Sequence, residues 1–373
     1  MLAMFDPLIQ FVAKAMAQVQ ASDLYIRAGR VWLRTPEGVL EATALPEFTR
    51  EEIKGFVEAI HRDGFIPKDY LEELNLPRSV DFAVTLPTSD PHTEVRLRFH
   101  GFRSRGEIVY AVRLIPPPAH SIMELGIETA VQDRLRGARG LFLVTGPTGA
   151  GKSTTLATLL QYITDHQHVH IVTLEDPIEY VISPGKAVVH QRELHKDFST
   201  FPEGLRAVLR ESPDVVMVGE VRDLDTLRWT LSLAEAGFLV LASYHTRSPQ
   251  ETVERIVGSF PDHEQNQARM RLATTLVGVL SQILLPATGP GAAQGQAVRR
   301  RVVAYEYMIV NDAIRTMIRE QKTHNILNAI TSGVGVRFED TLARLVRNRL
   351  VREDVALVNA PDPALLRQKL AYS

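Results

Sequence analysis

A strand, a glycine-rich loop and a helix are predicted to follow one another in the middle of this 373-residue chain. The apolar run GLFLVT at 140–145 leads directly into GPTGAGKSTT at 146–155. This loop satisfies the pattern G-x-x-x-x-G-K-[ST], whose glycines let successive backbone N–H groups point inward at phosphate oxygens. The helix that starts near Gly151 adds the positive end of its dipole, equivalent to about half a charge. The pattern predicts a nucleotide-phosphate site within an α/β fold.

The loop supplies the candidate nucleotide ligands. We expect Lys152 to reach the β- and γ-phosphates and the Ser153 hydroxyl to ligate Mg²⁺, so ATP and Mg²⁺ are the expected cofactors. The predicted nucleotide-binding residues are Gly146, Thr148, Gly149, Gly151, Lys152, Ser153 and Thr154.

Three more apolar runs, at 170–175, 215–220 and 238–244, alternate with helical segments, which is typical of a parallel sheet covered on both faces. Polar residues end these runs: TLEDPIE at 173–179, Glu220 and His245. Ligands of such sheets lie at the carboxyl ends of the strands. We expect Glu220 to orient or deprotonate the attacking water and to help hold the metal, and His245 to contact the γ-phosphate. The competing interpretations are an exposed strand-end carboxylate and a structural histidine.

The N-terminal third has a different pattern. Asp6 and Pro7 predict the start of a helix, and a further helical stretch runs from about residue 50 to 61. SVDFAVTLP and EVRLRFHGF alternate as strands do, and in the second Leu97 and Phe99 face away from Arg98. The run IPPPA at 115–119 cannot continue a sheet or a helix and predicts a semi-rigid linker.

These patterns predict an N-terminal domain over 1–115, a proline linker over 116–120 and an ATPase core over 121–287. A flexible loop over 288–298 and a C-terminal strand and helical region over 299–373 complete the predicted organisation. The last twenty or so residues are weakly patterned.

Composition excludes several classes of site and partner. The chain has no cysteine, which removes disulfides, thiolate zinc sites and cysteine nucleophiles. A formal net charge of −2 gives no excess of basic residues for binding nucleic acid, so no direct nucleic-acid partner is expected. The apolar N-terminal stretch is interrupted by Asp6, Pro7 and Lys14, and the stretch at 274–286 is too short to span a membrane. We therefore expect a cytoplasmic protein.

Beyond the loop, several motifs resemble the PilT-type retraction ATPases of type IV pili, members of the secretion-ATPase superfamily of hexameric motors. GPTGAGKSTTLATLL, TLEDPIEYV, HQRELHKD, LRESPDVVMVGEVRDLDTLR and ERIVGSFP match that family in order and spacing, as do QASDLYI, VRLIP and AIRTM. The resemblance extends over nearly the whole chain to about Leu350.

The resemblance implies a PAS-like α+β N-terminal domain, a RecA-like ATPase domain and a homohexameric ring with nucleotide at the domain junction. It also implies docking on an inner-membrane pilus platform protein at the cytoplasmic face of that membrane. Lys152 and Ser153 correspond to the Walker A residues, Glu220 to the Walker B glutamate and Glu179 to the acidic residue of the Asp box. His245 corresponds to the second histidine of the His box, and Arg98 and Arg113 to arginines that approach the phosphates in the ring.

The chain departs from the family pattern at three places. Phe238 stands where the family has the first His-box histidine, and Tyr25 replaces a histidine in the N-terminal motif. The family motif AIRNL, implicated in retraction, here ends in Thr316 and Met317. The residues that correspond to the family's hydrolytic site are therefore intact. The residues that the resemblance links to coupling hydrolysis with retraction are altered.

Four alternatives to a retraction motor remain open from the sequence. A pilus-assembly or type II secretion ATPase typically carries a four-cysteine zinc insert, which this chain lacks. An accessory PilT-like paralogue and a catalytically weak ATP-binding ring scaffold would both suit the altered coupling residues. A small-molecule kinase would need a lid and an acceptor site, neither of which the sequence suggests.

For a motor, we expect rotation of the two domains about the prolines at 116–118. The rotation would serve twitching motility or DNA uptake.

Overall fold

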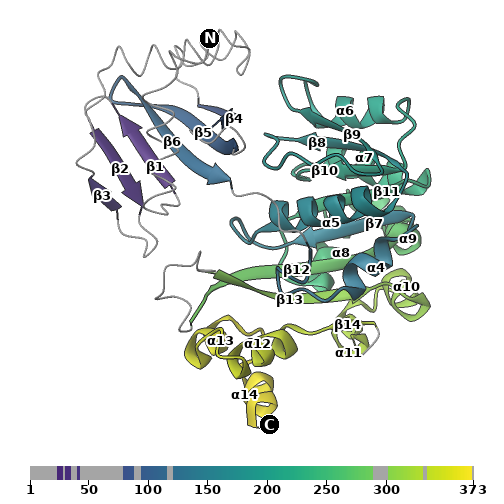
Figure 1. The fold of residues 1–373 in the computed structure, drawn as a ribbon. Coiled ribbons are helices and arrows are strands. Elements are labelled where there is room, and N and C mark those ends of the chain that lie inside the picture. Colours follow the sequence, from purple (N-terminus) through teal and green to yellow (C-terminus); the bar gives the residue numbers. More distant parts are fainter. Residues whose placement is uncertain are drawn as a thin grey trace. The chain divides into compact units, whose positions relative to one another are not determined.

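The chain forms two compact units (Figure 1). The computed structural model describes residues 23–27, 30–34, 40–42, 79–87, 94–115, 121–288, 301–330 and 334–371. The first unit takes in the chain up to Pro117 together with Asp176–Glu179, and the second takes in Pro118–Glu175 and the chain from Tyr180 onward. The predicted helices after Asp6 and at 50–61, the linker at 116–120 and the loop at 289–298 lie outside the described residues.

An antiparallel sheet makes up the described part of the first unit, with strand order β3-β2-β1-β6-β5-β4. The predicted alternation of β5 is confirmed, because Leu97 and Phe99 are fully buried while Arg98 is partly exposed. Phe82 of β4 stacks on Phe99, with 5.0 Å between the ring centroids. The strands are β1 (Asp23–Arg27), β2 (Arg30–Arg34), β3 (Leu40–Ala42), β4 (Val80–Pro87), β5 (Glu94–Ser104) and β6 (Glu107–Ile115).

The second unit is built on a mixed sheet with strand order β14-β13-β12-β7-β11-β10-β8-β9 among the described residues. The strands from β12 to β9 in this order run parallel, as the sequence predicts, and β13 and β14 add antiparallel pairs at the other end. The strands are β7 (Gly140–Thr145), β8 (His170–Glu175), β9 (Val188–Glu193), β10 (Val215–Val218), β11 (Leu239–Tyr244), β12 (Leu276–Pro286), β13 (Arg301–Ile309) and β14 (Gly335–Val336).

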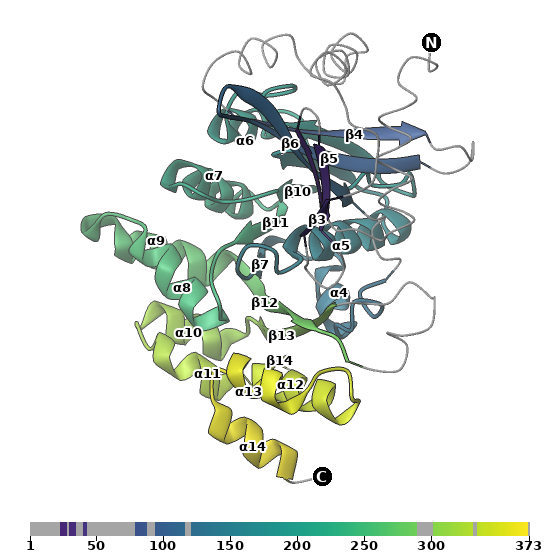
Figure 2. The same ribbon diagram turned by 90° about the vertical axis from the view of Figure 1, so that its left-hand side faces the viewer.

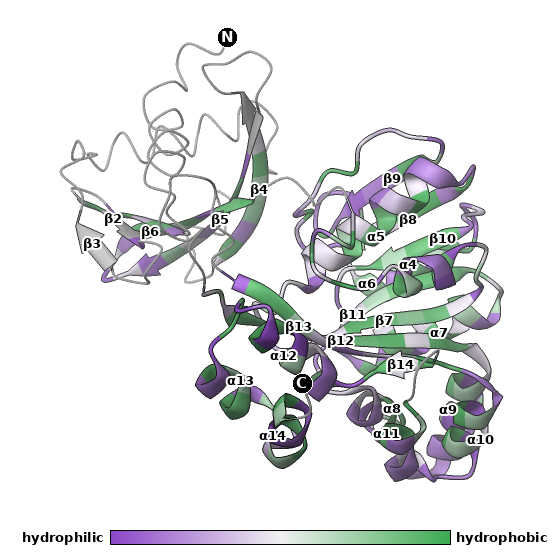
Figure 3. Cartoon of the chain, turned by 60° about the horizontal axis from the view of Figure 1, so that its bottom comes forward, coloured by the Kyte–Doolittle hydropathy of each residue, from purple (hydrophilic) through white to green (hydrophobic). Residues whose placement is uncertain are grey.

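Helices cover both faces of this sheet. In Figure 2, α4 and α5 lie on one face of the sheet and α7, α8 and α9 on the other. The central strands are buried from both sides, and β7, β10 and β11 accordingly appear largely hydrophobic in Figure 3. The helices of this layer are α4 (Ala130–Leu135), α5 (Lys152–His166), α6 (Phe201–Val208), α7 (Leu224–Glu235), α8 (Pro249–Gly258) and α9 (Asp262–Thr275).

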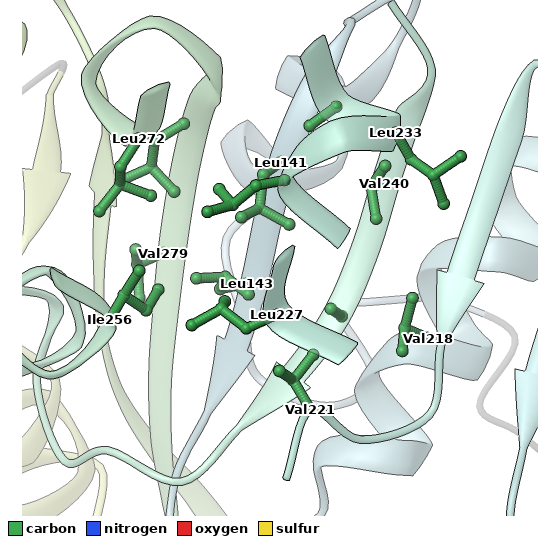
Figure 4. Close-up of a cluster of buried hydrophobic side chains, with 14 of the residues drawn as sticks. Leu141, Leu143, Val218, Val221, Leu227, Leu233, Val240, Ile256, Leu272 and Val279 are labelled. Atoms are coloured by element: carbon green, nitrogen blue, oxygen red, sulfur yellow. The ribbon is translucent and has the colours of Figure 1, made fainter. Parts of the chain in front are cut away.

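The main core lies between the sheet and the helices α7, α8 and α9 (Figure 4). Leu141 and Leu143 of β7 face Leu227 of α7, Ile256 of α8 and Leu272 of α9. Each such side chain contributes about 1.5–3 kcal/mol when it leaves water completely. Because these strands are apolar throughout, the polar chemistry of the second unit is confined to the strand ends and the loops that follow them.

Side-chain caps fix where the covering helices begin. Asp223 accepts a hydrogen bond from the backbone N–H of Thr226 at the start of α7, and Ser248 accepts one from that of Glu251 at the start of α8. Asn311 caps α10 (Asp312–Arg319) in the same way, by accepting from the N–H of Ile314. Such caps contribute about 1 kcal/mol each and satisfy N–H groups that a helix leaves open.

The C-terminal helices form a smaller second core. Leu285 of β12 and Ala304 of β13 pack with Phe338, Leu342 and Leu366. The weakly patterned tail is helical. Each of its two helices has one fully buried residue, Ala356 in the first and Leu366 in the second. None of the described helices is long and apolar enough to cross a membrane. The elements after β13 are α10 (Asp312–Arg319), the 3₁₀ turn η3 (Thr323–Asn325), α11 (Ile326–Ala329), α12 (Phe338–Arg347), α13 (Glu353–Asn359) and α14 (Pro363–Ala371).

Glu306, on β13, is a carboxylic acid in the interior of the second unit. Its side chain is 2% exposed, and its Oε1 has no hydrogen-bond partner among the described residues. Burial, together with the negative charge of Glu339, raises the pKa of Glu306 from 4.5 to about 7. The Phe338 backbone and the charge of Arg337 offset only part of this rise. Glu306 therefore holds its proton in the folded chain over a pH range in which the unfolded chain has lost it.

We predict that this carboxyl makes the second unit less stable as the pH rises. A raised pKa favours folding below the unfolded value of 4.5, and the benefit is lost as the pH rises through about 7. The Glu306→Gln variant, which cannot ionise, should match the wild type near pH 4, below the unfolded pKa. Near pH 8 it should be more stable by up to about 3 kcal/mol. Denaturant unfolding at both pH values measures the difference, with the exposed Glu320→Gln as control. A difference that does not change with pH contradicts the prediction.

Candidate nucleotide site

The phosphate loop connects β7 to α5 and curls as the motif predicts. Gly146, Gly149 and Gly151 have φ values of 151°, 78° and 84°, in the region that favours glycine. Gly151 is the N-cap of α5, so the first N–H groups of this helix open onto the loop. Successive N–H groups in such a curl, together with the helix dipole, suit a bound anion. The loop therefore fits the phosphates of a nucleotide.

Strand β12 lies directly behind the loop. A Cβ atom at Gly146 would lie 2.3 Å from the backbone oxygen of Gln282, which no side chain tolerates. The Gln282 side chain, fully buried, donates from Nε2 to the Ala150 carbonyl oxygen at 2.7 Å and accepts from the Thr155 hydroxyl at 2.9 Å. Gln282 thus ties the loop and the first turn of α5 to the sheet. Sequence reasoning missed this residue, although a lone glutamine in the apolar run LVGVLSQILLP was the available signal.

The remaining predicted ligands lie on the loop and the first turn of α5. Thr148 and Ser153 are exposed, so the Ser153 hydroxyl is accessible to a metal ion beside the loop. Thr154 is partly buried, and its hydroxyl lies 2.7 Å from the Tyr180 hydroxyl. Tyr180 is a second contact that sequence reasoning did not anticipate.

Lys152 lies across the mouth of the loop. Its Nζ donates to the carbonyl oxygens of Gly146 at 2.9 Å and Pro147 at 3.2 Å. The same ammonium group lies 3.4 Å from Nδ1 of His245. The loop lysine and the strand-end histidine, 93 residues apart in sequence, are therefore neighbours.

Glu220 and His245 are brought together because β10 and β11 are adjacent parallel strands. His245 Nε2 is hydrogen bonded to Glu220 Oε1, and Arg222 Nη2 lies 2.6 Å from Glu220 Oε2. Lys152 can only donate to Nδ1, so the neutral tautomer with its proton on Nε2 satisfies both contacts of the imidazole. The arrangement is a hydrogen-bonded series from Lys152 through His245 and Glu220 to Arg222.

The partners of Glu220 determine its ionisation. Burial alone would raise the pKa of the Glu220 carboxyl, but the hydrogen bonds from Arg222 and His245 and the charge of Arg222 outweigh it. The pKa therefore lies below its usual value, and Glu220 is a carboxylate at neutral pH. A carboxylate at this position can accept a proton from water or ligate a hard cation such as Mg²⁺.

The acidic residues after β8 separate into two environments. Glu175, the last residue of β8, is buried and accepts hydrogen bonds from Thr173 and from Gln191. Glu179 belongs to the first unit, where its Oε1 accepts from Arg98 Nη1 at 2.7 Å. The structure therefore pairs two of the predicted catalytic residues, Glu179 and Arg98, with each other.

The two predicted arginines are cross-strand neighbours in the first unit. Arg98 of β5 lies directly opposite Arg113 of β6, so both side chains emerge on one face of the sheet. Arg113 pairs with Asp23 at 2.8 Å but its side chain is still 62% exposed. The two guanidinium groups form one basic pair on that face.

The departures from the family motifs have distinct places in the fold. Phe238 precedes the first residue of β11, whereas His245 follows the last, so the strand separates them by about 20 Å. Arg315, in the AIRTM motif on α10, donates to the carbonyl oxygens of Ala273 and Thr274 at the end of α9. Tyr25 lies under the guanidinium of Arg34, 5.9 Å from the ring centroid. Within one chain, none of these residues belongs to the series that contains Glu220.

Comparison with known proteins places the chain in a family. A family model described as "Type II/IV secretion system protein" matches residues 3–355. The type IV pilus retraction ATPase PilT of Pseudomonas aeruginosa is 36% identical over 348 residues, which cover 93% of this chain and 95% of that protein. A twitching motility protein of Neisseria gonorrhoeae is 38% identical over 86% of this chain and 81% of its own length.

The structural comparison agrees. The crystal structure of the pilus retraction motor PilT with bound ADP matches with a TM-score of 0.82 and 35% identity, over 96% of this chain and 99% of that one. The expected fold class, an N-terminal domain followed by a RecA-like ATPase domain, is confirmed. The chain therefore belongs to the type II/IV secretion system protein family, and it is a PilT-type member of that family.

Proposed function

We propose that the chain is a motor ATPase that hydrolyses ATP in a homohexameric ring to drive retraction of type IV pili. The observation that carries the proposal is the series of Lys152, His245, Glu220 and Arg222 beside the phosphate loop. It joins the phosphate-binding lysine to a carboxylate at the strand ends, as hydrolysis of a bound nucleotide requires. The relatives named as retraction and twitching proteins, and the ADP bound to the PilT structure, support the same function.

Nucleotide and Mg²⁺ would be held by residues already close together in the second unit. The N–H groups around Gly146, Gly149 and Gly151 would bind the phosphates, and Lys152 would neutralise their charge. Ser153 and Glu220 offer oxygen ligands of the kind that Mg²⁺ prefers. When bound, the metal would supply further neutralisation of the phosphate charge.

Hydrolysis would use Glu220 as the base. A water molecule positioned by the Glu220 carboxylate attacks the γ-phosphorus, the bond to the bridging oxygen breaks, and the proton of the water passes to Glu220. His245 orients the carboxylate through its Nε2–H and lies next to Lys152 on its other side. The low pKa of Glu220 keeps the base ionised at neutral pH.

The ring would complete the site with arginines. Arg98 and Arg113 present two guanidinium groups on one sheet face, as is suited to stabilising charge on a transferring phosphoryl group. Glu179, which accepts a hydrogen bond from Arg98, would set the position of that arginine. In the assembled hexamer these residues would approach the phosphates, as the family resemblance implies.

Coupling to the pilus would run through the C-terminal part of the second unit. Arg315 of the AIRTM motif caps the C-terminus of α9, which leads directly into β12, the strand that carries Gln282. This route connects the motif to the back of the phosphate loop. The ring would dock on an inner-membrane platform protein at the cytoplasmic face.

We predict that Glu220→Gln retains nucleotide binding and loses hydrolysis. Glutamine keeps the size and the hydrogen bonds but cannot accept the proton of the water, so phosphate release should fall by at least about 100-fold. The matched control is Glu264→Gln, since Glu264 of α9 is also an arginine-paired carboxylate, 2.7 Å from Arg228 of α7. The control should release phosphate at the wild-type rate.

A phosphate-release assay with bound-nucleotide measurements decides between the alternatives. Normal release by Glu220→Gln would show that Glu220 is not the base. Negligible release by the wild type would favour the ring scaffold, and transfer of phosphate to an acceptor molecule would favour a kinase.

We also predict that Gln282→Met weakens nucleotide binding without contacting the nucleotide. Methionine leaves the Ala150 carbonyl and the Thr155 hydroxyl without their partner, at a cost of about 1–3 kcal/mol per group. If the loop loosens as a result, the Kd for ADP should rise about tenfold or more. The control is Gln161→Met, because the Gln161 side chain, on α5, also connects two segments, through hydrogen bonds to the backbone of Ser183, but lies outside the phosphate loop. Equal Kd values for Gln282→Met and the control would contradict the role of Gln282.

A further inference from the structure

A pair of histidines lies toward the end of the main sheet at which the parallel strands begin, whereas the phosphate loop lies at the end at which they finish. His170 is the first residue of β8, and His190 is the third residue of β9. His170 Nε2 and His190 Nδ1 are 2.8 Å apart, and the two rings are nearly perpendicular, at 88°. β8 carries its acidic residues at its other end, about 16 Å away. The histidine pair is therefore separate from the nucleotide site.

His170 is held from two sides. Its backbone N–H donates to Asp214 Oδ2 at 2.9 Å, and its ring Nδ1 lies 3.4 Å from the Ser212 carbonyl oxygen. Only a protonated Nδ1 can face a carbonyl oxygen, so the neutral ring presents the lone pair of Nε2 to His190. An N–H directed at a backbone carbonyl is the arrangement by which proteins orient a metal-binding imidazole.

We propose that His170 and His190 bind a divalent transition-metal ion of the class that prefers imidazole, namely Zn²⁺, Cu²⁺ or Ni²⁺. His190 is exposed, so its proton can move from Nδ1 to Nε2 by exchange with water. Both facing nitrogens then offer lone pairs, and no charge or electron has to be supplied. The metal would lie beside the line that joins the two nitrogens, with each ring turned so that its lone pair points at the metal.

The distance between the two nitrogens suits this exchange. With metal–nitrogen bonds of about 2.0–2.1 Å, two ligands lie about 2.9 Å apart at a right angle and about 3.3 Å apart in a tetrahedron. The observed 2.8 Å therefore needs an opening of about half an ångström at most, together with a rotation of the rings, because the hydrogen-bonded nitrogens now point at each other. β9 is the terminal strand of the sheet among the described residues, so the His190 ring is at an edge that can adjust.

The surroundings leave room for further ligands. A cavity of about 690 Å³ is lined by both histidines and by Asp197, Glu211 and Arg192. Asp197 accepts a hydrogen bond from the Glu193 N–H, and Glu211 pairs with Arg192, each at 2.7 Å. Within the described ranges, no three histidine or acidic side chains converge on one metal position, so water would complete the coordination.

The chain composition leaves imidazole as the ligand that such a metal prefers. There is no cysteine, so no thiolate competes for Zn²⁺ or Cu²⁺. The sequence before β8 reads HQHVH at 166–170, which places His168 two residues before His170 as a further imidazole. A bound metal would connect the edge strand β9 to β8.

Metal titration of the full chain tests the proposal. Protein stripped with a chelator is titrated with Zn²⁺ alone, and in a second series with Ni²⁺ alone, in excess Mg²⁺ that occupies the nucleotide metal site. We expect one tight equivalent per chain, whose affinity falls at least about tenfold in His170→Gln and in His190→Gln. Thermal unfolding of each variant without metal verifies that it is folded.

The matched control is His263→Gln, because His263 lies on α9 with its side chain 80% exposed, 3.5 Å from Glu264. This variant should bind Zn²⁺ as the wild type does. Absence of a tight equivalent in the wild type, or tight binding retained in both folded pair variants, overturns the proposal.

Discussion

The close approach of the phosphate loop to strand β12 is the constraint on which the second unit depends. Glycine is required at both ends of β7: a Cβ at Gly140 would lie 2.1 Å from the Thr275 carbonyl oxygen, and one at Gly146 would lie 2.3 Å from that of Gln282. β7 therefore lies between β11 and β12 with glycine at its first position and directly after its last, and Gln282 ties the loop that follows to the sheet. Donors held in this way need no reorganisation when phosphate binds, which is where preorganised sites gain their strength.

Two carboxyl groups of the second unit show how partners determine ionisation. Burial acts to raise the pKa of both Glu220 and Glu306. Glu220 has hydrogen bonds from Arg222 and His245, so its pKa falls below the usual value; Glu306 has Glu339 beside it, and its pKa rises to about 7. The carboxyl at the strand end is thereby kept ionised for chemistry. The carboxyl on β13 stays protonated and costs stability only at higher pH.

Local sequence signals predicted much of this architecture but not all of the candidate site. The loop motif, the apolar strands and the strand-end positions of Glu220 and His245 follow from residue patterns, because a buried parallel strand needs apolar residues throughout. Gln282 and Tyr180 were missed, since their roles depend on strands and loops far away in sequence. The grouping of Asp176–Glu179 with the first unit, and the pairing of Glu179 with Arg98, likewise come from tertiary contacts that no local pattern encodes. Phe238 looked like a lost site residue, but it lies at the far end of β11 from His245.

The altered motifs lie away from the residues that we propose for hydrolysis. Lys152, His245 and Glu220 remain in contact, whereas Phe238 and the AIRTM helix lie elsewhere in the fold. The retraction and twitching relatives support pilus retraction as the work that this chain powers. Deleting its gene in the source organism, with restoration from a plasmid, tests the claim most directly when surface pili and twitching are both measured. We expect the deletion strain to have excess surface pili and no twitching, and the wild-type gene to restore both. Unchanged pili and normal twitching in the deletion strain would contradict a role in retraction.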